Sequence, residues 1–338
     1  MLVTCAGILV ADVILADLPR VCHPGEVLFA PRGISLHIGG HAANVPIDLI
    51  NLGLKRNEVS TVGAVGNDPY GDFIMSILTE HGIPIHIRRI GEAGTAKSII
   101  LVVKGEDRRV YHDVGANYFL NPDYVKAILR EERPLIFYVG ATGLLGKFDE
   151  RLREVLKEAK AQNCLTFVDP VTPYQHGWEH LLNALELVDI FHCNNFEASG
   201  MTGISDLREA LRSISERGTE LAIVSIGEKG LVAATKEMVF EMPAFEVPVV
   251  DPTGAGDAFC AGTLQALIKM MADKSPDISK LSASDVVDML LHGEAAGAAC
   301  VTNVGTTTSV TAQKVNELMR QQGLEIRKHV LQSSILSK

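Results

Sequence analysis

Hydrophobic positions follow two patterns that alternate along the chain. Short continuous apolar runs predict buried strands, and apolar residues spaced about three or four apart predict amphipathic helices. The predicted strands cover residues 2–10, 59–65, 135–139, 165–168, 190–193, 221–226 and 231–234. The predicted helices cover residues 43–54, 121–131, 146–162, 178–187, 205–217, 258–272, 284–301 and 311–323. This alternation predicts an α/β fold of three layers, α/β/α, with a mostly parallel central sheet.

A β-hairpin signal interrupts the alternation between residues 95 and 116. Strand-like residues 98–103 and 108–114 flank a polar turn at 104–107, as in a hairpin. With further strand-like residues within 13–38, it predicts a small sheet that stands off the main sheet as a lid. We therefore expect one α/β domain over residues 1–323, with this lid, and a C-terminal tail over 324–338.

A glycine-containing stretch, Asp251 to Asp257, precedes the predicted helix 258–272. The start of a helix exposes unpaired amides with a partial positive charge, and glycines let the backbone approach a phosphate. The amides of Gly254, Ala255 and Gly256 could therefore bind a phosphoryl group, while Asp257 takes a proton from a hydroxyl. The alternative is that Asp257 is simply favourable in the first turn of a helix.

Two polar sites near the N-terminus could bind hydroxyl groups. Asp12 follows the first predicted strand, and ligands collect beyond the carboxyl ends of strands in open α/β sheets. Gly39 and Gly40 lead into a helix that carries Asn44, whose amide can both donate and accept hydrogen bonds. A turn aspartate and a helix-capping asparagine are the alternatives.

Three later loops carry further candidates. Asp169 ends a predicted strand, and the segment Asn194 to Glu197 offers an amide and a carboxylate suited to ordering a hydrated Mg2+. Ser225, Gly227 and Gly230 join two strands in a loop that a nucleotide phosphate could approach. Helix caps and hairpin turns remain the alternatives for each of them.

The amino-acid composition indicates which kinds of molecule the protein can bind. The 338 residues carry a net charge of −10, which argues against a general nucleic-acid or anionic-membrane surface and favours small-molecule chemistry. Six scattered cysteines without a Cys-x-x-Cys pair indicate a reducing compartment. No basic leader or membrane-length apolar run is present, so we expect a cytoplasmic protein.

The ordered motifs together resemble the ribokinase family of sugar and nucleoside kinases, also called phosphofructokinase-B-type carbohydrate kinases. The resemblance spans about residues 1 to 322, and its most specific motif is Asp251 to Asp257. The other motifs are Gly39-Gly40 with Asn44, Gly66-x-Asp68-x-x-Gly71, Gly115-Ala116-Asn117, Asn194-x-x-Glu197 and Ser225-x-Gly227-x-x-Gly230.

The resemblance implies ATP-dependent phosphorylation of a hydroxyl, with Asp257 as general base and the Gly254, Ala255 and Gly256 amides as anion hole. It assigns the acceptor to Asp12, Gly39, Gly40, Asn44 and Asn117. It assigns the nucleotide to Asn194, Ser225, Gly227, Gly230, Thr253 and Gly305. Mg2+ would bind Asn194 and Glu197 through water. A monovalent cation such as K+ would bind Asp251, Ser309 and the carbonyls of Thr253, Cys300, Asn303 and Gly305.

Departures from the family pattern concern the acceptor. Ribokinase has an asparagine where this chain has Val10 and a lysine where it has His41, and residues 140–143 lack an acidic residue. We therefore expect a neutral sugar, polyol or nucleoside rather than ribose or a sugar phosphate, and a homodimer that pairs through the lid. A nucleoside kinase and a non-catalytic sensor remain alternatives. A nicotinamide-dependent oxidoreductase is not favoured, because no Gly-x-Gly-x-x-Gly follows the first strand.

Overall fold

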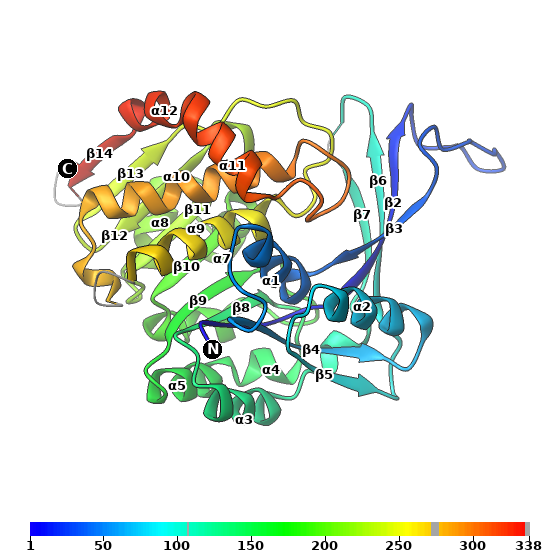
Figure 1. Cartoon of the computed structure of the whole chain (residues 1–338), viewed down its shortest axis with the longest axis horizontal. Helices are drawn as coiled ribbons and strands as arrows, with labels where there is room; N and C mark the ends of the chain where they lie inside the picture. Colours follow the sequence, from blue (N-terminus) through cyan, green and yellow to red (C-terminus); the bar gives the residue numbers. More distant parts are fainter. Residues whose placement is uncertain (107, 272–276, 335–338) are drawn as a thin grey trace.

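The computed structural model describes residues 1–106, 108–271 and 277–334, and its strands form a large and a small sheet (Figure 1). The large sheet runs in the order β14 (Leu331–Ser334), β13 (Met238–Met242), β12 (Leu231–Thr235), β11 (Leu221–Ser225), β10 (Ile190–Asn194), β9 (Leu165–Pro170), β8 (Ile136–Thr142), β1 (Val3–Ala6), β4 (Val59–Gly66) and β5 (Ile85–Ile90). Neighbouring strands from β11 to β5 are parallel. Those from β11 to β14 pair antiparallel. The predicted mostly parallel sheet is confirmed.

Helices cover both faces of the large sheet, because successive residues of its strands point to opposite sides. In β8, Ile136 and Tyr138 join one apolar cluster, and Phe137 and Val139 join another. The first cluster includes residues of α1 (His41–Asn51), α9 (Ala255–Met271), α10 (Ala283–Cys300) and α11 (Ala312–Leu318). The second includes residues of α3 (Pro122–Glu132), α5 (Leu152–Ala161), α7 (Asn195–Thr202) and α8 (Leu207–Ser215). The predicted three layers are therefore present.

The small sheet has the order β3 (Ser35–Gly39), β2 (Val10–Leu18), β6 (Ala96–Val103) and β7 (Arg109–Asp113). It stands beside the large sheet in Figure 1, where the sequence places a lid. The prediction of one strand over 2–10 is wrong, because the chain leaves the large sheet after Ala6 and enters the small one at Val10. Asp12 therefore lies within a lid strand, opposite His37 and Ser98.

Residues 324–334, which lie beyond the predicted domain limit at residue 323, form regular secondary structure. A short helix, α12 (Leu324–His329), follows that residue, and β14 then pairs with β13 at the edge of the large sheet. Predicted helices 146–162 and 178–187 are each divided, the first into α4 (Lys147–Glu150) and α5, the second into α6 (Glu179–Leu182) and a 3₁₀ turn. Predicted element residues 107, 272 and 335–338 lie outside the described residues.

A buried polar cluster joins the amino-terminal halves of β1 and β4 to the end of α3. Glu132 accepts hydrogen bonds of 2.6 Å from the hydroxyls of Thr4 and Ser60, and lies 2.8 Å from the His86 imidazole. Burial alone would raise the pKa of Glu132, but these hydrogen bonds lower it overall. The hydrogen bond to Glu132 raises the pKa of His86.

We expect Glu132→Ala to lower the free energy of unfolding by about 2–4 kcal/mol, because two buried hydroxyls lose their acceptor. The native contribution should fade as the pH rises through the raised pKa of His86 and as it falls through the lowered pKa of Glu132. Urea unfolding across a pH series measures both effects. The variant should lose this pH dependence, and Glu154→Ala on the exposed face of α5 should change little. An unchanged pH profile in Glu132→Ala would contradict this account.

Candidate active site

The segment 251–257 leads directly into α9, as the sequence predicts. Gly254 has a φ of 84°, and a Cβ there would lie 2.8 Å from the Cβ of Thr306, so glycine is required. The amide of Ala255 makes only a 3.4 Å contact with the Pro252 carbonyl, and helical bonding begins with Ala258 donating to Gly254. Amides at such a helix start can bind an anionic phosphoryl group.

Asp257 lies in the first turn of α9 and is 8% exposed. Its Oδ2 accepts a 2.7 Å hydrogen bond from the Asn44 amide, and the Asn44 oxygen accepts one of 2.8 Å from Thr306. Its Oδ1 has no hydrogen-bond partner among the described residues. Burial raises the pKa of Asp257, while its electrostatic interaction with His41 and the Asn44 hydrogen bond oppose that rise. Asn44 thus orients one oxygen of this carboxyl, and the other oxygen makes no hydrogen bond with the described residues.

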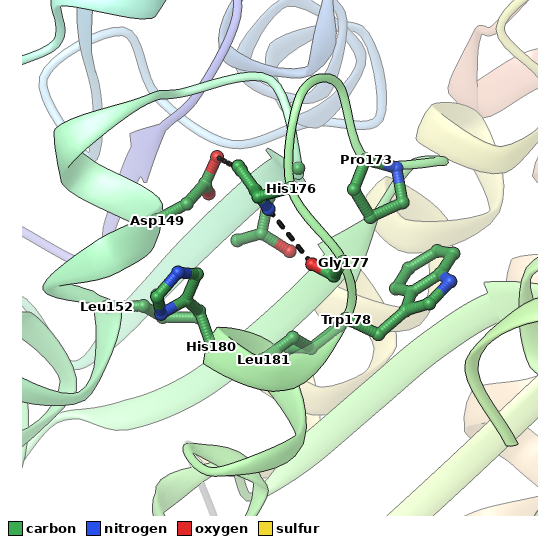
Figure 2. Close-up of a pocket in the computed structure, with 10 residues that line it drawn as sticks. Asp149, Leu152, Pro173, His176, Gly177, Trp178, His180 and Leu181 are labelled. Carbon is green, nitrogen blue, oxygen red and sulfur yellow. Dashed lines mark hydrogen bonds and ion pairs between the residues drawn. The ribbon is translucent and has the colours of Figure 1, made fainter.

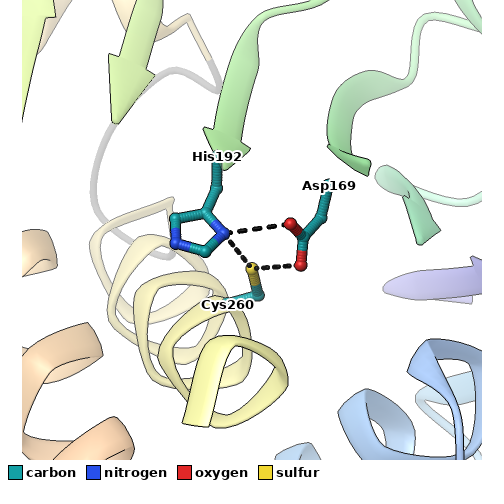
Figure 3. A group of neighbouring side chains, drawn as sticks. All are labelled: Asp169, His192 and Cys260. Carbon is teal, nitrogen blue, oxygen red and sulfur yellow. Dashed lines mark hydrogen bonds and ion pairs between the residues drawn. The ribbon is translucent and has the colours of Figure 1, made fainter. Parts of the chain in front are cut away.

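A second buried carboxyl, that of Asp169 at the end of β9, lies close by (Figure 3). Its Oδ1 accepts a 3.0 Å hydrogen bond from Nδ1 of His192, and its Oδ2 accepts from Tyr138 at 3.2 Å and from Cys260 at 3.3 Å. Burial pushes the pKa of Asp169 up, but the His192 charge and hydrogen bond bring it below its usual value. Nε2 of His41 lies 3.6 Å from Oδ2 of Asp169 and 3.6 Å from Oδ1 of Asp257.

The glycines predicted to bind the acceptor have steric reasons for their identity. A Cβ at Gly39 would lie 1.8 Å from Oδ2 of Asp12, and one at Gly40, where φ is 89°, would lie 2.4 Å from the Ile8 carbonyl. Asp12 is buried, which raises its pKa to about 6 although a hydrogen bond from Ser98 opposes the rise. The backbone at Gly39, just before α1, therefore lies in close contact with the Asp12 carboxyl.

Asn117, which is predicted to contact the acceptor, has its side chain hydrogen-bonded to the backbone of Leu9. Its side chain is fully buried, its oxygen accepts a 3.0 Å hydrogen bond from the Leu9 amide, and its NH2 donates a 3.1 Å hydrogen bond to the Leu9 carbonyl. Both polar groups of this side chain therefore form hydrogen bonds with the backbone. Asn117 holds the segment between β1 and β2, where the backbone passes from one sheet to the other.

Asn194 and Ser225, both predicted to bind the nucleotide, are the last residues of β10 and β11. Asn194 and Glu197 form a reciprocal capping box on α7, which is the alternative that the sequence left open. Burial raises the pKa of Glu197 to about 7. The Ser225 hydroxyl lies 3.2 Å from Nε2 of His192. Gly227 and Gly230 have positive φ values in the turn between β11 and β12.

The predicted cation-binding residues converge from two segments. One oxygen of Asp251 accepts from the amide and hydroxyl of Thr253, at 3.0 and 2.6 Å, and the other accepts from the Gly305 amide at 3.3 Å. The Ser309 hydroxyl donates to the Cys300 carbonyl at 3.3 Å, and the Cys300 thiol lies 3.4 Å from the Thr253 carbonyl. Carbonyl, carboxylate and hydroxyl oxygens thus gather here, which suits a hard cation.

A separate small hollow lies beside the ends of β8 and β9 (Figure 2). Its residues are Thr142, Gly143, Asp149, Leu152, Pro173, His176, Gly177, Trp178, His180 and Leu181. The ion pair with Asp149, at 3.4 Å, raises the pKa of His176 to about 9. None of the residues predicted for catalysis or binding lines this hollow, so it is distinct from the site around Asp257.

Sequence reasoning missed the residues that position the two carboxyls. Thr306 supports Asn44, while His192 and Cys260 contact Asp169. No local motif identifies these three, since each comes from a different element and they meet only in the fold. Asp169 itself could be found, because it ends a parallel strand at the edge where ligands bind.

Comparison with known proteins identifies the family. Residues 1–313 match the family described as pfkB family carbohydrate kinase. The chain is 26% identical to ribokinase of Haemophilus influenzae over 96% of this chain and 98% of that protein. Its fold is similar to that of ribokinase from Giardia lamblia, with a TM-score of 0.81 at 22% identity, covering 94% of this chain and 99% of that one. It is also similar to a fructokinase with bound ATP from Xylella fastidiosa, with a TM-score of 0.77 at 23% identity, covering 95% and 98%.

Within the described parts of the chain, no helix combines the length and apolar character needed to cross a membrane. The match over residues 1–313 includes the small sheet, the strands of the large sheet other than β14, and the segment 251–257. The order of motifs along the sequence, the two-sheet fold and the carboxyl at the start of α9 agree with that match. The chain therefore belongs to the pfkB family of carbohydrate kinases, the ribokinase-like sugar and nucleoside kinases.

Proposed function

We propose that this kinase transfers the γ-phosphoryl group of ATP to a hydroxyl of a small neutral sugar or polyol. Oδ1 of Asp257 takes the hydroxyl proton as the oxygen attacks the γ-phosphorus, and ADP leaves with the electrons of the broken P–O bond. The amides at the start of α9 stabilise the charge on the transferring group. The observation that carries this proposal is Oδ1 of Asp257, which lies in the first turn of α9 and is buried without a hydrogen-bond partner among the described residues.

Electrostatics favours an uncharged acceptor. Asp12, Asp169 and Asp257 are buried carboxyls, and Asp257 raises the pKa of Asp12 by charge repulsion, so the two are close enough to interact. Cations on and near the hairpin have other partners, since Lys97 pairs with Asp113, Arg89 with Asp72 and Arg109 with Glu106. A phosphate or carboxylate on the acceptor would need fixed cations. These contacts therefore favour a neutral sugar or polyol.

The donor side of the proposal includes two cations. Mg2+, when bound, supplies positive charge to the nucleotide phosphates, and the oxygens of Asn194 and Glu197 suit a hydrated ion of this kind. The oxygens around Asp251, Thr253 and Ser309 would hold a monovalent cation next to the anion hole. Ser225, Gly227 and Gly230 would border the phosphates. Replacing K+ by tetramethylammonium tests the monovalent site, and an unchanged rate would argue against it.

ADP production from ATP and Mg2+ with a panel of sugars, polyols and nucleosides tests the activity. We expect ADP and a phosphorylated product with at least one neutral sugar or polyol, at a rate well above that with ATP alone. Sugar phosphates and sugar acids serve as charged comparisons. A shift in melting temperature with an acceptor, without ADP, would instead indicate a sensor. If the enzyme prefers a nucleoside, it is a nucleoside kinase of this family and not a sugar or polyol kinase.

The exposed face of the small sheet supports the further proposal of a homodimer. Leu36, Val13, Ile99 and Tyr111 form one row across its four strands, because each is the register partner of the next. Leu36, Ile99 and Tyr111 are 41%, 49% and 65% exposed. A second copy could bury this apolar row. Light scattering with Ile99→Lys would test this pairing, and an unchanged dimer would exclude this row.

A further inference from the structure

His192 contacts both sides of the candidate active site through one ring. Its Nδ1 lies 3.0 Å from Oδ1 of Asp169, and its Nε2 lies 3.2 Å from the Ser225 hydroxyl. The three residues come from β10, β9 and β11, which are neighbours in the large sheet. Asp169 is on the side of the proposed general base, because Nε2 of His41 lies 3.6 Å from both Asp169 and Asp257. Ser225 is on the side predicted for the nucleotide.

The same ring lies against the start of α9. His192 stacks on Phe259, with ring centroids 4.8 Å apart and ring planes inclined by 24°. A Cβ at Gly256 would lie 3.7 Å from Cε1 of His192, so an edge of the ring faces the backbone of the predicted anion hole. Figure 3 shows that Nδ1 also faces Cys260, whose Sγ is 3.5 Å away. A ring that is 3% exposed and in contact on these sides cannot shift without moving a neighbour.

The two ring nitrogens make different hydrogen bonds. The charge and hydrogen bond of His192 hold the pKa of Asp169 below its usual value despite burial. An ionised carboxylate only accepts hydrogen bonds, so Nδ1 carries a proton and donates to Asp169. Nε2 is left to pair with the Ser225 hydroxyl at the end of β11. The ring therefore orients a carboxyl with one nitrogen and a hydroxyl with the other.

We propose that His192 is a positioning residue for phosphoryl transfer, which ties the nucleotide loop at Ser225 to the start of α9 and to the Asp169 carboxyl. The transfer depends on in-line placement of the acceptor oxygen and the γ-phosphate, and a displacement of about 1 Å can cost roughly 100-fold in rate. The ring holds groups on the donor side and the acceptor side in one arrangement. This inference rests on the proposed kinase function and adds a residue that aligns its two halves.

A mutant cycle tests this tie, because Ser225 and Asp169 both contact His192 but share no hydrogen bond among the described residues. Ser225→Ala and Asp169→Ala are made singly and together, with native His192 and with His192→Leu. The reaction uses the acceptor that gives the most ADP in the panel. His192→Leu alone should lower kcat by roughly 10- to 100-fold through misalignment.

With native His192, the double variant should lose less kcat/KM for ATP than the product of the two single losses, by about fivefold or more. The reason is that the second substitution acts on a ring that the first has already released. In the His192→Leu background the two losses should simply multiply. A role of His192 in stability alone would lower the melting temperature without producing this pattern. Calorimetric titration with ATP and Mg2+ gives the same cycle in nucleotide affinity and needs no acceptor.

His292→Leu is the matched control. Its half-buried imidazole lies 2.8 Å, at Nδ1, from the Asp288 carbonyl of its own helix, α10, and the substitution should leave kcat unchanged. If His192→Leu or Asp169→Ala fails to fold, His192→Gln and Asp169→Asn replace them. The glutamine amide can take the place of Nε2 but not of Nδ1, so the two losses should again multiply.

Four outcomes separate this inference from the proposed function. Losses that multiply with native His192 would overturn the inference and leave the kinase function in place. Coupling that persists in a folded His192→Leu or His192→Gln protein would also overturn it, because another contact would then join Ser225 to Asp169. Coupling in ATP affinity without ADP from any acceptor would overturn the proposed function and support the tie through His192. A native protein that binds no ATP would overturn both.

Discussion

The Asp257→Asn variant should lose phosphoryl transfer by about 10²–10⁴-fold in kcat, because the group that receives the hydroxyl proton is gone. Its fold should persist. The amide oxygen can still accept from Asn44, and the substitution removes a buried charge whose pKa is already raised by burial. Steady-state ADP production gives the rate, and thermal unfolding gives the stability.

Asp72→Asn separates the two interpretations of Asp257. Asp72 is also an acidic residue in the first turn of a helix, α2 (Pro69–Glu80), but it is exposed. If an aspartate at this place only favours the helix start, both variants should cost a little stability and neither should change the rate. We expect the rate to fall in Asp257→Asn alone. Near-native turnover in that variant would remove Asp257 from the mechanism.

The larger elements of the fold could be predicted because each has one strong local pattern. Strands such as β8 and β11 begin with continuous apolar runs, since helices cover both faces of the large sheet. Because buried strands are apolar on both faces, the sequence does not show where β1 ends and β2 begins. Residues 3–10 are all buried and, apart from Thr4 and Gly7, apolar, so periodicity carries no sign that the chain changes sheets. The cause is tertiary: a Cβ at Gly7 would lie 2.4 Å from the Gly140 carbonyl, a contact between distant segments.

Edge elements were missed for the opposite reason. All four residues of β14 are exposed and β5 is only partly buried, so neither gives a strong hydrophobic run. Strand β14 exists because β13 offers it an edge to pair with. Such pairing depends on where the chain returns in space, which local pattern does not encode.

In the candidate site too, local motifs could be predicted and contacts between distant elements could not. The helix start that carries Asp257 and its glycines could be predicted because these residues form one contiguous segment of the sequence. Asn44 was found, but its contact with Asp257 and Thr306 was not. For Asn194 and Glu197 the structure shows the capping role that the sequence left as an alternative. Roles that depend on three elements meeting, such as that of His192, need the fold.

Gly254→Ala should reduce kcat by roughly 100-fold, comparable to the loss of a donor from an oxyanion hole. A side chain at a φ of 84° is strained, and its Cβ would lie 2.8 Å from the Cβ of Thr306. Thr306 donates to Asn44, which in turn holds Asp257. The variant should therefore displace both the amides at the start of α9 and the general base. ADP production and nucleotide affinity together report the change.

Gly203→Ala provides the matched control for backbone strain. Gly203 ends α7 with a φ of 72°, and a Cβ there would have no heavy atom within 4 Å. It should lose stability of about 1 kcal/mol through its left-handed conformation alone, with no effect on the rate. The excess loss of activity in Gly254→Ala then measures the geometry of the anion hole. Equal rates in the two variants would mean that the amides of 254–256 do not stabilise the transferring phosphoryl group.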